Sequence, residues 1–555
     1  MAVLPQNDPN PSQRDLDLQS KRDLYRYYVP DLPRVPRIVE LAAEEKFDDR
    51  WSQAETLRQA RAEGAALDSL TINLNSFGAY AELHRTLPSK PSVTSHWMSN
   101  ECFADQRLAG VNPLMIRRVS SSAPLPAASK IDDGHAAETG VKLQTAIDEG
   151  RIFVCDYRDL NRLPNLGGFV PTVGLVVPQK RVRAPIALFY WQGDRESGGL
   201  RPLAIQTDQD TDVAVFTPKD HPHAWAMAKA GVQVADAHLH QYDSHIVRTH
   251  LSMAVFKIAA ERQLAQAHPV LQLLRPHLRF LLAINEAAFS VLINPGGYVD
   301  ELMAPTWLDS MKMVDHFWKT WTFRDLCPLP KELASREMDS VTTPHIAYPY
   351  RDDGMLIYGA IEAFVGEFVD IYYRDDSDVT NDVELQLFVA ELTAPDRLGV
   401  RDLTPDDKIV TLAALKEVLT AAIWTCGPQH AAVNFPQWDY VGHVPNMPLA
   451  GYRDLPLEGD QPMEADVLSY LPPNHPPSVV SGKQVAVMYY LGTYRYDMLG
   501  YYQDKDFDDP EAWDAVARFQ CNLARVGGEL FRVDQQRRTS YPYLWPWNIP
   551  NSTSI

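Results

Sequence analysis

The chain has 555 residues, and 45% of them are hydrophobic, so it can bury a large core. Acidic residues number 72 against 52 basic ones, giving a formal charge of −20, which excludes a general nucleic-acid binder because that function needs a basic surface. The five dispersed cysteines form no Cys-x-x-Cys pair, and neither a signal peptide nor an apolar run long enough to span a bilayer is visible, so we expect a cytoplasmic protein.

The first 217 residues predict a tail, short helices and then a small sheet. Residues 1–20 are polar and rich in Pro, Asn and Asp, so we expect a flexible tail there. Residues 21–64 carry short helical patterns between prolines, and a helix that starts at Glu101 should end at Gly110. Short β-branched or aromatic runs predict a small antiparallel sheet, with strands at residues 152–155, 173–177, 186–190 and 213–216.

Helical patterns dominate the rest of the chain. They cover residues 225–269, 354–373, 382–392, 408–425, 484–492 and 513–535. Residues 539–555 carry three prolines, which favours an extended coil. Because no internal repeat or interdomain linker interrupts the pattern, residues 21–555 should form one mainly α domain with a small antiparallel sheet.

Three histidines, His240, His245 and His250, recur at intervals of five within residues 225–269. This stretch contains no proline before its last residue and is rich in Ala and Leu, so it predicts one long, largely buried helix. Five residues of regular α-helix turn the chain by about 500°, which leaves His245 and His250 roughly 140° apart. Either the histidines are unrelated, or a π-type turn, which closes at i→i+5, brings two imidazoles to one point as metal ligands.

Two further candidates lie near the C-terminus. His430 and Asn434 are four residues apart, so on an α-helix they share a face, with two alanines between them leaving room for a bulky group. They form either half of a metal site or a buried, hydrogen-bonded pair. The chain ends on the apolar Ile555, which suggests a buried end, and a buried carboxylate needs a positive partner such as a metal ion.

Together these pieces resemble the lipoxygenases, a family of non-haem iron fatty-acid dioxygenases. That family binds iron through the last two histidines of a His-x4-His-x4-His run, a His-Ala-Ala-Val-Asn segment and a C-terminal isoleucine carboxylate. The resemblance implies iron, with manganese as a less favoured variant, at His245, His250, His430, Asn434 and the carboxylate of Ile555. It also implies supporting roles around these ligands for His240, Gln241 and Gln437.

Further matches extend from about residue 102 to the end of the chain. They include Phe-Ala-Asp-Gln-Arg-Leu-Ala-Gly-Val-Asn-Pro from Phe103 and His-Pro-Val-Leu-Gln-Leu-Leu-Arg-Pro-His from His268. The resemblance implies a large helical catalytic domain of the short bacterial kind, without the N-terminal β-barrel domain of larger members. Any weak association with a lipid surface would then use the helical N-terminal part.

The resemblance implies an enzyme that inserts O2 into polyunsaturated fatty acids of the linoleate and linolenate class. A ferric-hydroxide centre would take a hydrogen atom from a bis-allylic methylene, and the pentadienyl radical would capture O2 to give a conjugated-diene hydroperoxide. The protein would hold the methylene, exclude water and steer O2. The alternatives are a 9-specific lipoxygenase, a fatty-acid hydroperoxide isomerase on the same fold and a non-catalytic lipid-binding scaffold.

The resemblance also implies an apolar pocket lined by a helix at residues 284–299, which includes Val299. Leu292 and Leu491 match the pair that clamps the reacting carbon, although most leucines simply pack in a core. Ala288 stands where the family has alanine or glycine. Alanine there accompanies S-configured products, because its methyl group can block O2 from one end of the pentadienyl.

One position departs from the family pattern. Plant members carry an arginine that pairs with the substrate carboxylate, and this chain has Met447 in its place. Burying a carboxylate without a partner is costly. We therefore expect the methyl end of the substrate to go in first and oxygenation at the 13S position of linoleate, although another basic residue could replace the arginine.

Overall fold

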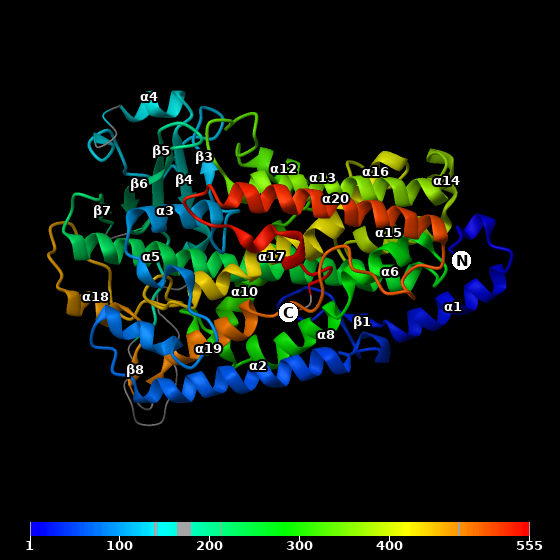
Figure 1. Ribbon diagram of the computed structural model, residues 1–555, viewed down its shortest axis with the longest axis horizontal. Coiled ribbons are helices and arrows are strands. Elements are labelled where there is room, and N and C mark those ends of the chain that lie inside the picture. Colours follow the sequence, from blue (N-terminus) through cyan, green and yellow to red (C-terminus); the bar gives the residue numbers. More distant parts are fainter. Residues whose placement is uncertain are drawn as a thin grey trace.

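Helices dominate the computed structural model, which describes residues 2–137, 140, 142–163, 179–210, 213–475, 478–553 and 555. They form an elongated body, and a small sheet lies towards one end of it beside the helix α4, Leu143–Asp148 (Figure 1). The prediction of a mainly α fold with a small antiparallel sheet is confirmed.

The helices follow one another with short connections. The N-terminal ones are α1 Pro11–Leu24, α2 Asp49–Asp68, α3 Asn100–Ala109 and α4. The middle of the chain forms α5 Pro222–Leu239, α6 Ser252–Gln263, α7 Pro269–Leu274, α8 Leu281–Ala287, α9 Tyr298–Leu302, α10 Trp307–Thr320, α11 Phe323–Leu326 and α12 Leu329–Ser335. The C-terminal part forms α13 Pro349–Tyr372, α14 Asp376–Asn381, α15 Val383–Thr393, α16 Leu412–Trp424, α17 His430–Asn434, α18 Glu464–Tyr470, α19 Val480–Gly492 and α20 Pro510–Asp534.

Several π-helical segments interrupt this pattern. They are η8 His240–Leu251, η10 Ala288–Leu292, η11 Thr425–Gln429 and η12 Gln437–Val441. Each carries, or directly adjoins, residues that the sequence singled out. Because π-helical turns are rare and concentrate at functional sites, we expect these four segments to surround the functional site.

The predicted long helix exists and runs through the middle of the molecule as α5, η8 and α6 (Figure 1). Pro222 occupies its first turn, where a proline removes no helical hydrogen bond. The helix ends at Gln263, six residues earlier than expected, and Leu264 adopts an extended conformation. Nearly all side chains of α5 and α6 are buried, so this helix is a central support for the fold.

The sheet has five antiparallel strands in chain order, β3 Arg117–Arg118, β4 Ile152–Asp156, β5 Ile186–Gln192, β6 Gly199–Gln206 and β7 Val215–Phe216. Three of the predicted strands match β4, β5 and β7, and the one at residues 173–177 lies outside the described residues. The sequence did not predict β6, which contains Pro202. This proline pairs with Phe189 where the register shifts, and such irregularities tolerate proline in a strand. Two further two-stranded sheets pair β1 Tyr27–Tyr28 with β2 Arg37–Ile38, and β8 Asn474–His475 with β9 Ser478–Val479.

The N-terminal segment corrects the expectation of a flexible tail over residues 1–20. Residues 11–24 form α1, which packs on α6. Arg14 is buried there and pairs with Glu384, donating from Nη2 to Oε2 over 3.0 Å. The segment is polar, but it can still pack against the core, because a distant carboxylate neutralises the charge of its buried arginine.

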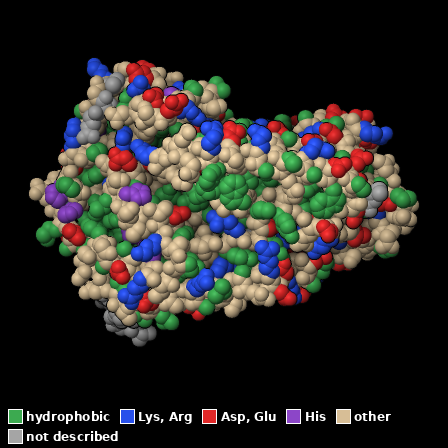
Figure 2. Space-filling model, in the orientation of Figure 1, with side chains coloured by type: hydrophobic (Ala, Val, Ile, Leu, Met, Phe, Trp, Pro, Cys, Tyr) green, Lys and Arg blue, Asp and Glu red, His purple; other side chains and the backbone are tan. Residues whose placement is uncertain are grey.

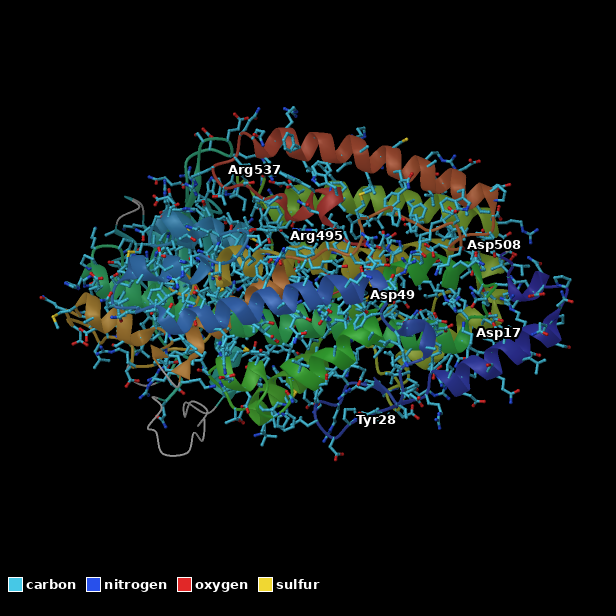
Figure 3. All side chains as sticks on the ribbon, turned by 60° about the horizontal axis from the view of Figure 1, so that its bottom comes forward. Asp17, Tyr28, Asp49, Arg495, Asp508 and Arg537 are labelled. Atoms are coloured by element: carbon cyan, nitrogen blue, oxygen red, sulfur yellow. The ribbon has the colours of Figure 1, made fainter. Side chains whose placement is uncertain are left out.

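The helix α2 is longer than the short patterns predicted for residues 21–64. The side chain of Asp48 caps it by accepting a hydrogen bond from the Trp51 amide. Figure 3, in which Asp49 marks its start, shows α2 crossing the front of the molecule. It runs antiparallel to α19, because Ser69 lies against Gly482 whereas Arg58 donates to the Tyr490 carbonyl over 2.9 Å. A Cβ at position 482 would lie 1.9 Å from the Ser69 hydroxyl, so only glycine permits this approach.

A large hydrophobic core joins the helices to one face of the sheet. The C-terminal end of the chain lies in the middle of the molecule (Figure 1), and Ile555 is only 6% exposed. On the face shown in Figure 2, acidic and basic side chains are mixed, with apolar groups between them. None of the described helices combines the length and the apolar character needed to cross a bilayer.

Candidate metal centre and pocket

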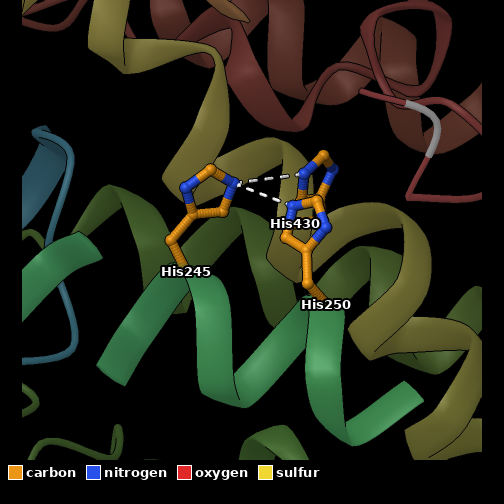
Figure 4. Close-up of side chains that lie close together, drawn as sticks. All are labelled: His245, His250 and His430. Atoms are coloured by element: carbon orange, nitrogen blue, oxygen red, sulfur yellow. Dashed lines mark hydrogen bonds between the residues drawn. The ribbon is translucent and has the colours of Figure 1, made fainter. Parts of the chain in front are cut away.

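Three buried histidines converge at the centre of the fold. His245 and His250 extend from η8, and His430 extends from the start of α17, so that the three rings face one another (Figure 4). The Nε2 atom of His245 lies 3.2 Å from that of His250 and 3.3 Å from that of His430. All three side chains could therefore bind one ion.

The π-helical geometry of η8 explains how two histidines five residues apart reach the same point. A π-helix closes its hydrogen bonds at i→i+5, so His245 and His250 lie on one face instead of roughly 140° apart. Of the two interpretations of the histidine run, the structure thus supports the distorted helix.

All three rings are neutral at physiological pH. Burial lowers the pKa of His250 to about 4, and burial together with the neighbouring rings lowers the pKa values of His245 and His430 well below their usual range. The Nδ1–H of His250 donates to Oδ1 of Asn285 over 3.0 Å, which leaves its Nε2 lone pair facing the other rings. Neutral imidazoles with converging lone pairs are what a metal ion requires.

Asn434 is fully buried one turn beyond His430 and lines the same cavity as His245 and His250. Its Nδ2 donates to the Leu491 carbonyl over 3.0 Å, and its Oδ1 accepts a hydrogen bond from Gln437 over 2.8 Å. Gln437 in turn accepts from Gln241 over 2.7 Å. A chain of amides therefore fixes the orientation of Asn434 and ties α17 to η8 and α19.

His240 and Asn285 orient the backbone and the rings around the centre. His240 donates from Nε2 to the Val433 carbonyl over 2.7 Å, next to Asn434. Asn285 binds both the ring and the main-chain carbonyl of His250. The sequence analysis did not single out Asn285, although a polar residue directly after the apolar run 281–284 of α8 was a signal.

The end of the chain reaches the histidines. A main-chain oxygen of Ile555 lies within hydrogen-bond reach of the His430 ring. The preceding residues are held firmly, because Thr553 donates to the Cys426 carbonyl over 3.0 Å and Asn551 accepts at its carbonyl from Nδ1 of His277 over 3.0 Å. The sequence did not identify His277 or Thr553 as part of this arrangement.

These residues fit a bound metal ion. Separations of 3.2 and 3.3 Å between Nε2 atoms suit adjacent ligands of one ion, since metal–nitrogen bonds measure about 2.1 Å. Imidazole nitrogens with amide and main-chain oxygens, and no thiolate, form a donor set that suits iron or manganese. Without an ion, three neutral imidazoles would hold their lone pairs against one another in a buried space.

A cavity of about 350 Å³ opens beside the histidines. Its walls are mainly apolar, and the four predicted pocket residues, Ala288, Leu292, Val299 and Leu491, all line it. The expectation of a single helix over residues 284–299 is wrong. The chain forms α8 and then η10, and a loop separates η10 from α9. The π-helical turn of η10 carries Ala288 and Leu292, and both pack against the core.

Met447 is fully buried and is not among the described residues that line this cavity. The one Lys or Arg among those lining residues is Lys483, on α19. The basic residue at the cavity is therefore on α19, and not at position 447, where plant members carry their arginine.

The fold is mainly helical, and three buried histidines that could hold one metal ion lie beside a mainly apolar cavity. Comparisons with known proteins identify the family. The family model described as Lipoxygenase matches residues 74–540, and the chain belongs to the lipoxygenase family.

Curated relatives agree with this assignment. The chain is 30% identical over 575 residues to an allene oxide synthase-lipoxygenase protein of Plexaura homomalla, covering 98% of this chain and 53% of that protein. It is 34% identical to hydroperoxide isomerase ALOXE3 of Mus musculus, covering 85% and 64% of the two chains, and 33% identical to linoleate 9/13-lipoxygenase of Pseudomonas aeruginosa, covering 84% and 68%. The chain thus spans about half to two thirds of the length of these relatives.

Solved structures share the fold. The structure of Delta413-417:GS LOX superposes with a TM-score of 0.90 at 30% identity, and covers all of this chain and 83% of its own. The structure of coral 8R-lipoxygenase gives a TM-score of 0.89 at 29% identity with the same coverage.

Proposed function

We propose that this protein inserts O2 into polyunsaturated fatty acids of the linoleate and linolenate class and forms S-configured conjugated-diene hydroperoxides. The observation that carries this proposal is a cluster of three neutral histidines, two of which, His245 and His250, line an apolar cavity. A hydrocarbon chain in that cavity would lie beside a metal held by these histidines, and the mainly apolar walls would exclude water.

The side chains of His245, His250, His430 and Asn434 and a main-chain oxygen of Ile555 would hold iron. The chemistry that bound iron supplies is one-electron oxidation of a bis-allylic C–H bond. Leu491 and Leu292 border the cavity and would hold the methylene, which is the geometric contribution that positioning makes to a rate. Oxidation of that C–H bond would remove one electron and one proton, the pentadienyl radical would add O2, and return of that electron and proton to the peroxyl group would give the hydroperoxide.

The relatives differ in the reactions that their names give, and the proposal must choose among them. The P. aeruginosa relative is a linoleate 9/13-lipoxygenase, so both regiochemistries occur among similar proteins. We favour 13S, because Met447 offers no partner for a carboxylate that would enter first, and so the methyl end enters the cavity. The 9-specific reaction is the alternative for the same site.

A hydroperoxide isomerase is the second candidate, and the similarity to ALOXE3 of M. musculus favours it. Oxygen uptake separates the two. We expect the iron-loaded protein to consume one O2 for each diene formed from linoleate. Loss of added fatty-acid hydroperoxide without O2 uptake, and no uptake with linoleate, would identify the isomerase. A protein that binds linoleate but converts neither substrate would be a lipid-binding scaffold.

Ala288→Gly is expected to increase the share of R-configured product. Ala288 lines the cavity on η10, and its methyl group is the part that would shield one end of the pentadienyl from O2. Chiral chromatography of the reduced products from linoleate checks this prediction. Ser290→Gly on the same turn is a matched control, because Ser290 is exposed and is not among the described lining residues. An unchanged R-to-S ratio in Ala288→Gly would show that this methyl group does not steer O2.

A further inference from the structure

The charged residues that line the cavity differ in the sign of their charge, and so in whether they could bind an anion. Among the described lining residues they are Glu55, Glu63 and Lys483. Glu55 is bonded to the Tyr490 hydroxyl and lies 3.4 Å from Arg58, and Glu63 accepts from Gln59 over 2.8 Å. Two of the three groups are carboxylates and would repel an anion, so Lys483 is the group that could attract one.

Lys483 lies at a partly open edge of the cavity. Its side chain is 35% exposed and pairs with Glu301, which is 30% exposed. Ion pairs with this degree of exposure contribute little stability, because water solvates both charges. A substrate carboxylate could therefore replace Glu301 on the ammonium group at little cost.

The backbone that carries Glu301 is fixed, so such an exchange involves side chains alone. The buried Lys180 donates from Nζ to the carbonyls of Asp300 and Glu301, over 2.6 and 3.2 Å. Asp300 also accepts from the Trp307 amide over 2.7 Å. These bonds hold α9 in place while the Glu301 side chain remains free to turn towards solvent.

Lys483 also lies at a useful distance from the reacting centre. It precedes Leu491 by eight residues on α19, which is ~12 Å along a helix axis. About ten carbon–carbon bonds of ~1.5 Å each, in a zigzag chain, span a similar distance. A bis-allylic carbon in the middle of an eighteen-carbon acid can therefore lie at Leu491 while its carboxylate lies at Lys483.

We propose that Lys483 is the binding group for the carboxylate of a free fatty acid, and that Glu301 occupies this group until the substrate displaces it. This inference rests on the proposed function, whose cavity and orientation of substrate it uses. The carboxylate remains at the partly exposed edge and the methyl end lies inside, so the enzyme distinguishes a free acid from an ester at Lys483.

The test compares linoleate with methyl linoleate, which lacks the negative charge. In Lys483→Gln, the preference for acid over ester, expressed as the ratio of kcat/KM values, is expected to fall about tenfold, because a charge-assisted hydrogen bond is lost. The fall should arise mainly in KM for the acid. Lys483→Arg should restore most of the preference, whereas Glu301→Gln should lower KM for the acid by removing its competitor.

Lys312→Gln is the control. Lys312 is 58% exposed, pairs with Asp309 on one turn of α10 and is not among the described residues that line the cavity. Its acid-to-ester ratio should equal that of the unchanged protein. An equal ratio in Lys483→Gln as well would overturn the inference.

Calorimetric binding of linoleate under argon separates this inference from the proposed function. If the unchanged protein forms no diene from either substrate, the proposed function fails, but weaker binding of linoleate to Lys483→Gln would still support the carboxylate site. If dienes form and linoleate binds equally to both proteins, the proposed function stands and the site at Lys483 is refuted.

Discussion

His250→Ala is expected to lower bound iron from near one equivalent to a trace and to reduce diene formation by at least about 100-fold. The imidazole of His250 lies 3.2 Å from His245 and would supply one of three nitrogen ligands. The variant also leaves Oδ1 of the buried Asn285 without the ring N–H that donates to it, which adds a cost to stability. Metal analysis of the purified protein, together with the rate of diene formation, measures both effects.

An exposed histidine gives the matched control for this variant. His96 lies on the surface and contacts Ser95, far in sequence from the proposed ligands. His96→Ala should retain iron and activity. Normal iron content in His250→Ala would contradict the assignment of His250 as a ligand, and circular dichroism would show whether either variant has lost its helices.

Deletion of Ile555 is expected to have an effect of similar size. A main-chain oxygen of Ile555 reaches the His430 ring, and removal of the residue would place the last carboxylate on Ser554, too far back along the chain to take its place. The contacts of Asn551 and Thr553 remain, so the segment should stay folded. Iron content and diene formation should both fall by at least about tenfold.

Ile555→Val separates the main-chain group from the side chain. This variant keeps the main-chain oxygen and loses one methylene from a side chain that is 6% exposed. It should therefore keep its iron, with at most a small loss of stability, about 1 kcal/mol. If the deleted protein kept its iron and its full rate, Ile555 would not be a ligand.

The sequence predicted the centre of the molecule better than its periphery. The interval of five residues between His245 and His250 has few physical explanations, and a π-helical turn was one of them. The spacing of His430 and Asn434 predicted a shared helix face, and in the structure His430 joins the other two histidines while Asn434 lines the cavity beside them. Such local patterns depend on helix geometry, which the sequence encodes directly.

Other features depend on contacts between distant parts of the chain. Asn285 supports His250 because α8 packs against the long helix, and Lys483 reaches the cavity because α19 lies along α2 and α9. The polar start of the chain suggested a tail, but Arg14 pairs with Glu384, 370 residues further on. No local pattern predicts such pairings, because they require the fold itself.

The most direct test of the central claim is the product formed from linoleic acid in air by protein of measured iron content. We expect about one iron per chain and a conjugated diene, and chiral analysis of the reduced product should show mainly the 13S hydroxy acid. Iron-loaded protein that forms no diene and consumes no O2 would contradict the proposed dioxygenase reaction, and a mainly 9-configured product would contradict the methyl-end-first orientation.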